Sequence, residues 1–487
     1  MIIALLPWII ISSTALLVML LTAIKRDHLY ISCITSLGLF IALLTQTAQI
    51  SLSESMIYEN NLISINNTTA LLSALLILLA LVLSSLLYPW LKKLHEPSEE
   101  YYLLFLFATQ GALVVAASSH FGSFFLGLEL MSLSLVAMVA YVDKSSKALE
   151  AGIKYFVLSA LASAFMLMAI AIIYLYSGTL AFSEILIQMS SSQLAVASDN
   201  NIVLSAAIVL LLVGVAFKLS LAPCHLWVAD LFEGAPLASA AFLATLAKAA
   251  IFILLIKLFE STHWHQLNAV VSIVSMIAAA SMLIGNLLAL LQKNILRLLA
   301  YSSIAHFGYL LLAILAIAPS TPLSEQYSLS TEAAIFYLIA YLVTVLSIFA
   351  ILMLLADSRQ LQNFQISSFK GLFWHNPAAA IVLALLLLSL AGIPLTIGFV
   401  GKFYLTLVAV NSQLWWLLSV LIVSSIIGLF YYLRIILCLL EKTQPLPNTK
   451  PATVLNITIL ALISLAVIGL GVFPGQLALL IQRIVIS

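Results

Sequence analysis

Apolar stretches long enough to cross a lipid bilayer recur along nearly the whole chain. A membrane helix needs about 20 mostly apolar residues, and about fourteen segments meet this requirement. The pattern therefore predicts an all-helical integral membrane protein. The predicted spans cover residues 2–23, 29–48, 69–89, 102–118, 122–142, 149–176, 202–222, 236–259, 267–289, 295–318, 330–356, 377–410, 412–438 and 453–474.

Two of these spans carry helix breakers. Pro223 breaks the seventh span, and Gly392 with Pro394 breaks the twelfth, each time after the sequence Leu-Ser-Leu-Ala. Broken helices at corresponding positions of two halves are typical of transporters built from inverted repeats. We therefore predict two inverted five-helix repeats, at about 102–259 and 267–438. Because no long polar linker separates soluble regions, residues 1–487 are predicted to form a single polytopic membrane domain.

Lys and Arg residues alternate between loops. Short cytoplasmic loops of membrane proteins collect basic residues, and here the odd-numbered loops hold nearly all of them. This alternation supports fourteen spans and predicts that both termini face the periplasm. Lys257 is the exception, and with Glu260 we expect it to be solvated in an even-numbered loop. The basic residues of the odd-numbered loops are Lys25, Arg26, Lys92, Lys93, Lys144, Lys147, Lys293, Arg297, Arg359, Lys370, Arg434, Lys442 and Lys450.

Composition agrees with a membrane protein and excludes several functions. Of the 487 residues, 64% are hydrophobic and 8% are charged, and the mean hydropathy is +1.21. The net charge of +1 gives no reason to expect nucleic acid as a partner. The three cysteines form no metal-binding or disulfide spacing, and the chain has neither a phosphate-binding loop nor a dinucleotide fingerprint. We therefore predict no cofactor, metal or redox centre in this chain.

Among the charged residues within the predicted spans, five are the candidates for a function, because a charge at the centre of a membrane helix costs about 2.5–3.5 kcal/mol on insertion scales. They are Lys154, Lys218, Lys248, Lys402 and Glu129. Such charges pair with one another or face internal water. Burial disfavours the charged form of a lysine, so a buried lysine can take up and release a proton. Together these residues predict a proton relay.

Two histidines fit the same relay. His225 directly follows the break at Pro223, and His306 lies in the tenth span. An imidazole accepts a proton on one nitrogen and donates one from the other. We also expect the breaks to free backbone carbonyls, which hold water at membrane depth.

Structural roles compete with these functional ones. Lys154 lies close enough to the start of its helix to extend its ammonium to the cytoplasmic interface. The other lysines and Glu129 could form static pairs that hold helices together. His306 could equally be a hydrogen-bonded core histidine.

Three segments resemble the antiporter-like membrane subunits of respiratory complex I, the bacterial NADH:quinone oxidoreductase. The first is Phe217–Trp227, Phe-Lys-Leu-Ser-Leu-Ala-Pro-Cys-His-Leu-Trp, followed by Glu-Gly-Ala-Pro at 233–236. The second is Lys293–Tyr309, which contains Ala-Tyr-Ser-Ser-Ile-Ala-His-Phe-Gly-Tyr. The third is Gly-Phe-Val-Gly-Lys-Phe-Tyr at 398–404. The resemblance extends over about residues 1–475.

The resemblance implies a translocase that carries protons across the bacterial inner membrane while other subunits perform the redox chemistry. Its partners would be other membrane subunits of the complex, the lipid bilayer and protons. Glu129 would pair with Lys218, and redox-driven shifts in charge would alternately strengthen and weaken this pair. Lys402 would lie near the periplasmic exit. The implied proton-transfer residues are Glu129, Lys218, His225, Lys248, Lys402, Lys154 and His306.

Two other functions stay open from the sequence. A subunit of a multi-subunit cation/proton antiporter would share the helix arrangement and the lysines. A static helical scaffold would need the buried charges for assembly rather than for turnover.

Overall fold

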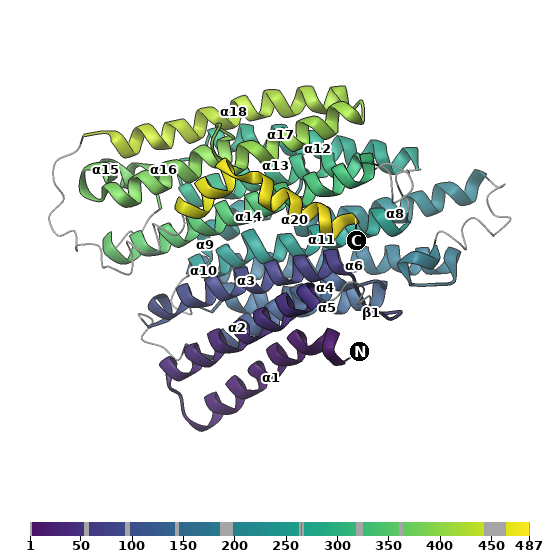
Figure 1. The fold of residues 1–487 in the computed structure, drawn as a ribbon, viewed down its shortest axis with the longest axis horizontal. Coiled ribbons are helices and arrows are strands. Elements are labelled where there is room, and N and C mark those ends of the chain that lie inside the picture. The colour runs from purple at the N-terminus through teal and green to yellow at the C-terminus, as the bar shows by residue number, and fades with distance from the viewer. Residues whose placement is uncertain are drawn as a thin grey trace. The chain divides into compact units, whose positions relative to one another are not determined.

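A computed structural model describes residues 2–52, 58–92, 98–141, 146–185, 198–262, 264, 267–317, 325–359, 364–442 and 464–486. Almost all of these residues are helical (Figure 1). The two-residue strands β1 (Tyr58–Glu59) and β2 (Ser64–Ile65) pair antiparallel, with Tyr58 opposite Ile65. The predicted all-helical class is confirmed.

Eleven helices in the described part of the chain are long and apolar enough to cross a membrane. The number rises to twelve if the bent pair Ser464–Val472 and Pro474–Ile484 counts as one span. The remaining predicted spans correspond to shorter apolar helices, Val203–Leu219, Pro377–Ala391 and Ile397–Asn411. They are short because the breaks interrupt them, and the total of fourteen spans stays a prediction.

The chain divides into two compact units. Unit 1 contains residues 1–219 and 234–273. In it α4 packs on α5, α6 packs on α8, and α1, α2 and α3 pack in sequence. Its helices are α1 (Ile2–Ile24), α2 (His28–Leu52), α3 (Asn67–Leu91), α4 (Glu99–Ala117), α5 (Phe121–Val139), α6 (Ser146–Ser177), α8 (Ser198–Leu219), α10 (Leu237–Phe242), the π-helix η2 (Leu243–Ala247) and α11 (Lys248–Thr262).

Unit 2 contains residues 220–233 and 274–486. Here α14 is central, since it packs on α13, α16, α17 and α20. The helices of this unit are α9 (Leu226–Gly234), most of α12 (Asn268–Leu290), α13 (Ile295–Leu315), α14 (Glu325–Arg359), the short 3-10 helix η4 (Ile366–Phe369), α15 (Leu372–His375), α16 (Pro377–Ala391), α17 (Ile397–Asn411), α18 (Trp415–Leu440) and α20 (Pro474–Ile486).

Asparagine side chains start two of the helices in unit 2. The Asn294 Oδ1 accepts the Leu296 amide at 2.8 Å at the start of α13. The Asn376 Oδ1 accepts the Ala379 amide at 3.3 Å, and Pro377 is the first residue of α16. An asparagine cap satisfies an amide that the helix itself leaves free, and proline suits the first helical position.

Both predicted breaks are present. Helix α8 ends at Leu219, and the next helix begins at Leu226. Helix α16 ends at Ala391, and Gly392 follows with φ +83°. Each break also holds a residue other than glycine with positive φ, Ser220 at +61° and Leu395 at +74°. A side chain in the left-handed region costs about 1–2 kcal/mol, and such strain gathers at functional sites.

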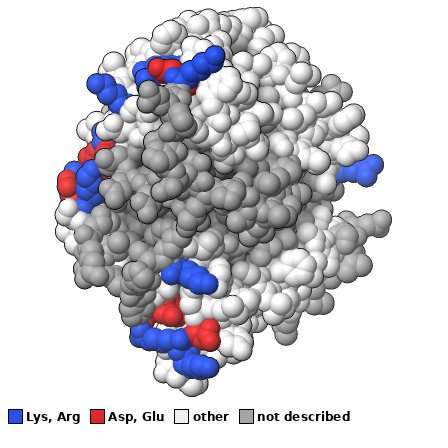
Figure 2. All heavy atoms as spheres, turned by 90° about the vertical axis from the view of Figure 1, so that its left-hand side faces the viewer, with Lys and Arg blue, Asp and Glu red and all other residues white. Residues whose placement is uncertain are grey.

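Ion pairs at the helix ends agree with the predicted loop alternation. In unit 1, Arg26 Nη2 lies 2.9 Å from Glu100 Oε1 and so joins loops one and three. In unit 2, Lys370 contacts Glu441 at 3.1 Å and so joins loops eleven and thirteen. Figure 2 shows Lys and Arg side chains beside Asp and Glu side chains on the face that it draws. Within each unit, therefore, these odd-numbered loops share one side.

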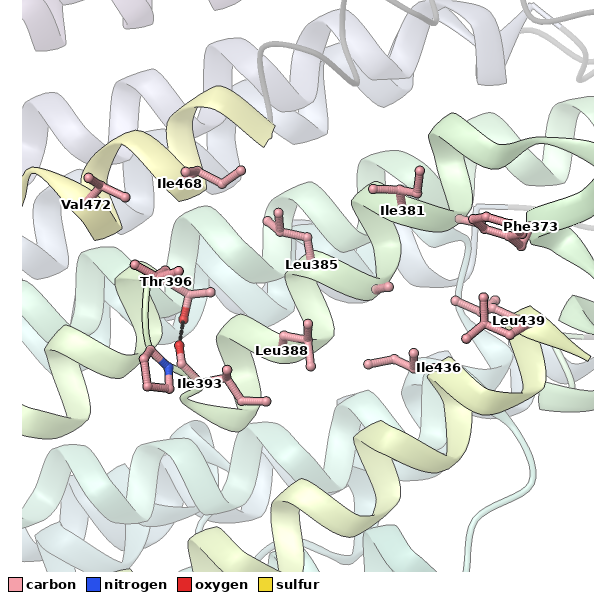
Figure 3. A pocket seen from close by; sticks show the side chains of 15 residues that line it. Phe373, Ile381, Leu385, Leu388, Ile393, Thr396, Ile436, Leu439, Ile468 and Val472 are labelled. Carbon is pink, nitrogen blue, oxygen red and sulfur yellow. Dashed lines mark hydrogen bonds between the residues drawn. The ribbon is translucent and has the colours of Figure 1, made fainter.

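An apolar groove of about 470 Å³ lies in unit 2 beside the second break (Figure 3). Leu385 and Leu388 of α16 line one wall, and Ile436 and Leu439 of α18 line another. No titratable side chain lines this groove.

We expect Gly398→Ala to destabilise unit 2. An added methyl group would overlap the carbonyl oxygen of Ser389, so α16 and α17 would have to separate. Overpacking of this kind costs about 1–3 kcal/mol, and thermal unfolding of the full chain in detergent should show a lower midpoint. Gly475→Ala is the control, because its methyl group would meet nothing within 4 Å. Equal midpoints for the two variants would contradict this account of the packing.

Candidate functional site

The buried ammonium of Lys218 is held by two serine hydroxyls in unit 1. Lys218 lies in the last turn of α8 and is 3% exposed. Its Nζ donates to Ser132 Oγ of α5 at 2.8 Å and to Ser159 Oγ of α6 at 2.7 Å. Buried charges require hydrogen-bonding partners. These hydroxyls therefore allow a lysine to lie within the predicted membrane span.

Glu129 lies one helical turn from the serines that bind Lys218. Its Oε1 accepts a hydrogen bond from Ser163 of α6. Glu129 precedes Ser132 by three residues on α5, and Ser163 follows Ser159 by four on α6. Two levels of polar groups therefore lie between α5 and α6. One level holds the Glu129 carboxylate, and the other holds the Lys218 ammonium.

The carboxylate acts on Lys218 without touching it. Among the described residues, Glu129 makes no ion pair with Lys218 within 4.0 Å, although its charge still interacts with the ammonium. The two groups therefore have different serine partners in this structure, Ser163 for Glu129 and Ser132 with Ser159 for Lys218, and the predicted pairing stays a prediction. Tyr155, a buried residue of α6, hydrogen-bonds with Ser132. Each hydroxyl can both donate and accept, so Ser132, Ser159 and Tyr155 surround the ammonium with groups that can exchange a proton.

Lys248 is the second buried lysine of unit 1. It is fully buried, and it is the first residue of α11, directly after the π-helix η2. The helical span Leu237–Thr262 that contains it is enclosed inside the structure. Single π turns within α-helices are frequent at functional sites. Both the position and the irregular backbone fit a relay residue.

Lys402 lies at the second break, in unit 2. Its Nζ donates to the carbonyl oxygen of Ala391, the last residue of α16, at 2.9 Å. The ammonium also lies 5.3 Å from the centre of the Tyr309 ring, a cation–π distance. A methyl group on Gly392 would lie 2.7 Å from Lys402 Cδ. The break thus supplies a freed carbonyl and, through the absence of a side chain at Gly392, the space for the lysine.

His306 lies within a cluster of tyrosines in unit 2. Its Nδ1 lies 2.7 Å from the Tyr337 hydroxyl, and its Nε2 lies 3.3 Å from the Tyr432 hydroxyl. The tyrosine cluster continues through Tyr309, whose hydroxyl contacts Asn286 at 3.0 Å and Ser424 at 3.1 Å. Both alternatives for His306 survive, because the same bonds satisfy a core histidine and connect a relay.

His225 is buried without a well-formed hydrogen bond on either ring nitrogen in the described part of the chain. The carbonyl of Pro223 is nearby, and the Tyr301 ring lies 6.4 Å away. A buried polar group without partners is uncommon, and here both nitrogens remain available. The predicted relay role of His225 stays a prediction; His225 and Lys218 belong to different units.

Lys154 differs from the other lysines. Its Nζ lies 2.7 Å from Glu150 Oε1 one turn earlier on α6, and the side chain is 46% exposed. The structure thus places it on the exposed face of α6 instead of among the buried groups. Its predicted role in proton transfer stays a prediction.

Two further charged residues, Lys257 and Glu332, are enclosed in the structure, and neither was among the predicted site residues. Lys257, expected to be solvated, instead donates to the carbonyls of Ser64 and Ala117 at 3.0 Å each. Ala117 ends α4, where free carbonyls attract a cation. Glu332 is 2% exposed within α14. Its position within the predicted eleventh span, an acid in an apolar stretch, was the available signal.

The described residues contain no group of three or more His, Cys, Asp or Glu side chains that could hold a metal ion. The candidate site therefore consists of lysines, carboxylates, imidazoles and hydroxyls.

Known proteins share both the sequence and the fold. The chain is 44% identical over 482 residues to the NADH-quinone oxidoreductase subunit N of Shewanella woodyi, with 99% of each chain covered. It is similar to a chain of respiratory complex I from Thermus thermophilus, with a TM-score of 0.79, 27% identity and coverage of 97% and 98%. A chain of the Mrp complex from Dietzia sp. DQ12-45-1b shares the fold, with a TM-score of 0.84, 18% identity and coverage of 100% and 97%.

A family model agrees with these similarities. The model described as NADH:quinone oxidoreductase/Mrp antiporter, TM, matches residues 118–428. The matched region includes Glu129, Lys218, Lys248, His306 and Lys402. This chain therefore belongs to the transmembrane family of NADH:quinone oxidoreductase and Mrp antiporter subunits.

Proposed function

We propose that this chain is a proton-translocating membrane subunit of a bacterial NADH:quinone oxidoreductase. It carries protons from the cytoplasm to the periplasm, and the transfer of electrons from NADH to quinone takes place in other subunits. One observation carries the proposal: the Lys218 ammonium is buried at a helix break, bonded to neutral hydroxyls, with Glu129 one turn away. The full-length relative named subunit N supports the choice of complex.

The separation between Glu129 and Lys218 provides a means of coupling. At an effective dielectric constant of about 20, two charges attract by about 4 kcal/mol at 4 Å and about 2 kcal/mol at 8 Å. The difference of about 2 kcal/mol changes a proton equilibrium roughly 30-fold. A small movement of Glu129 toward or away from Lys218 would therefore load or release a proton.

Lys402 and His306 would perform the corresponding step in unit 2. Lys402 has a carbonyl and an aromatic ring as partners instead of a carboxylate, so its proton is not locked into an ion pair. The bonds of His306 to Tyr337 and Tyr432 provide donors and acceptors for transfer. Lys248 and His225 are proposed as further relay residues, and Lys154 as a peripheral one.

The arrangement in the membrane is part of the proposal. Fourteen spans with two inverted five-helix repeats would place both termini in the periplasm, in a multi-pass protein of the inner membrane. The two helix breaks and the ion pairs between odd-numbered loops support this topology. The partners would be other membrane subunits of the complex and the surrounding lipid.

A subunit of a cation/proton antiporter is the second candidate. The fold similarity to the Mrp complex chain favours it. Identity of 44% over the whole length of a complex I relative, against 18% to the Mrp chain, favours the first candidate. Co-purification with flavin and iron–sulfur proteins would support complex I, and its absence would support the antiporter.

Replacing Lys218 by Ala should abolish NADH-driven proton pumping in membrane vesicles while a native gel still shows the assembled complex. The reason is that no other group takes the place of the ammonium between Ser132 and Ser159. Lys370→Ala, which removes an exposed cation paired with Glu441, should pump normally. Wild-type pumping by the Lys218 variant would disprove the central role of this lysine, and loss of assembly would favour the static scaffold.

Replacing Ser132 and Ser159 together by Ala should slow pumping by at least about tenfold, because positioned proton donors and acceptors typically contribute more than that. The variant keeps the lysine but removes both of its hydroxyl partners. Ser85→Ala is the matched control, since this serine bonds only the carbonyl of Val82 on an exposed face. Unchanged pumping by the double variant, measured with the assay used for Lys218, would rule out a role of these two hydroxyls in proton transfer.

A further inference from the structure

Three hydrogen bonds fix the amide of Asn286, a buried residue of α12 in unit 2. Its Nδ2 donates to the carbonyl oxygen of Met282 at 2.8 Å and to the Tyr309 hydroxyl at 3.0 Å. Its Oδ1 accepts from the Tyr431 hydroxyl at 3.0 Å. Because a carbonyl only accepts, the nitrogen of the amide must face Met282. The orientation of the amide is thereby decided, and both of its hydrogens are in use.

Tyr309 connects this amide to Lys402. The Lys402 ammonium lies 5.3 Å from the centre of the Tyr309 ring. The hydroxyl of the same ring accepts the hydrogen bond from Asn286 and also contacts Ser424 Oγ at 3.1 Å. Tyr309 is therefore a neighbour that the lysine and the amide share.

A second line of contacts connects the amide to His306. The Nε2 of His306 lies 3.3 Å from the Tyr432 hydroxyl. The hydroxyls of Tyr432 and Tyr431 interact with each other, and Tyr431 donates to Asn286. The polar contacts of both proposed relay residues in unit 2 thus end at the same amide.

Asn286 lies about one helical turn from a face of the membrane. Helices α12 and α13 are each long and apolar enough to cross a membrane, so the turn between them, residues 291–294, lies at one face. Asn286 precedes Leu290, the last residue of α12, by four residues, a rise of about 6 Å. The loop alternation predicts that this face is the cytoplasmic one.

A fixed positive charge lies at the end of α12. Arg434 of α18 donates to the carbonyl oxygens of Leu290 and Gln292 at 2.9 and 2.7 Å. It follows Tyr431 by three residues on α18, so its contacts lie about one turn closer to the membrane face than those of Asn286. An arginine charge in a membrane pore is a barrier to protons and other cations.

An amide does not pass protons as a hydroxyl or an imidazole does. A hydroxyl can accept a proton on a lone pair and donate its own, and an imidazole does the same through its two nitrogens. The amide of Asn286 accepts only on oxygen and donates only from nitrogen, and neither atom titrates near neutral pH. Both lines of contact therefore end at a group that carries no proton.

We propose that Asn286 is a proton insulator that, together with Arg434, separates the relay of unit 2 from the membrane face at the α12–α13 turn. The inference rests on the proposed function. A pump requires such a barrier, because a proton that returned from Lys402 or His306 to the side of uptake would contribute nothing to net transport. The amide satisfies both phenol hydroxyls and offers the proton no acceptor on that side.

A purely structural role is the alternative, in which Asn286 only joins α12 to α13 and α18. The two roles differ in which substitution matters. Aspartate and leucine are both similar in size to asparagine and both remove the amide nitrogen, but only aspartate can carry a proton. An insulator is lost with aspartate alone, whereas a structural contact is lost with both.

The test compares Asn286→Asp, Asn286→His and Asn286→Leu in the intact complex, reconstituted in proteoliposomes. Two quantities are measured, the protons pumped per NADH oxidised and the passive decay of an imposed pH gradient without NADH. We expect the two titratable variants to assemble, to oxidise NADH and to pump fewer protons per NADH. The gradient should decay at least about tenfold faster in both, because a positioned proton carrier typically contributes more than that.

Two further variants should behave as the wild type in both measurements. Asn286→Leu breaks the same hydrogen bonds without adding a proton carrier. Asn411→Asp is the matched control, since it makes the same exchange at an exposed residue at the end of α17.

Wild-type decay of the gradient in an assembled Asn286→Asp complex would overturn the inference. Equal acceleration in the Asp and Leu variants would overturn it too, because the leak would then come from disturbed packing. Failure of both titratable variants to assemble would assign the amide a structural role and end the inference.

Lys218→Ala in the same preparation separates this inference from the proposed function. If Lys218→Ala loses pumping and Asn286→Asp shows no added leak, only the role of Asn286 fails. If Lys218→Ala pumps normally, the proposed function of the chain fails, whatever the gradient decay in the Asn286 variants.

Discussion

A charge can remain inside a bilayer only where other polar groups replace the water it has lost, and the architecture of both units follows from this constraint. In unit 1 these groups are side chains, since the hydroxyl oxygens of Ser132 and Ser159 accept hydrogen bonds from the Lys218 ammonium. In unit 2 the polar group belongs to the backbone, since the carbonyl oxygen of Ala391 accepts a hydrogen bond from the Lys402 ammonium. Serine hydroxyls on neighbouring helices keep Lys218 within an apolar fold, and a helix break does the same for Lys402.

The partners of these lysines also explain why protons could move. An ion pair in direct contact holds its proton firmly, whereas a hydroxyl, a carbonyl or an aromatic ring holds a cation and leaves it free to exchange. Glu129 accepts a hydrogen bond from Ser163, one turn from the serines that hold Lys218. A small movement of Glu129 would therefore change the attraction between its carboxylate and the Lys218 ammonium. His306 extends the same principle, because each of its ring nitrogens faces a tyrosine hydroxyl that can both donate and accept.

Much of this organisation was predictable from residue type and spacing. The apolar periodicity indicated the helical class, and the breakers located both interruptions, because proline and left-handed glycine end helices wherever they lie. The ion pairs that join odd-numbered loops agree with the alternation of Lys and Arg. Errors arose at the ends of spans, where Lys257 and Glu332 could equally have been solvated, and only packing decided that both are enclosed.

The sequence by itself determined that this protein is a helical membrane protein with charges at the points where its helices break, since those properties depend on local composition. The tertiary structure decided which groups meet these charges. Ser159 contacts Lys218 from 59 positions away, and Tyr432 meets His306 from 126 positions away. No local pattern encodes such contacts, because they depend on how whole helices rotate and cross.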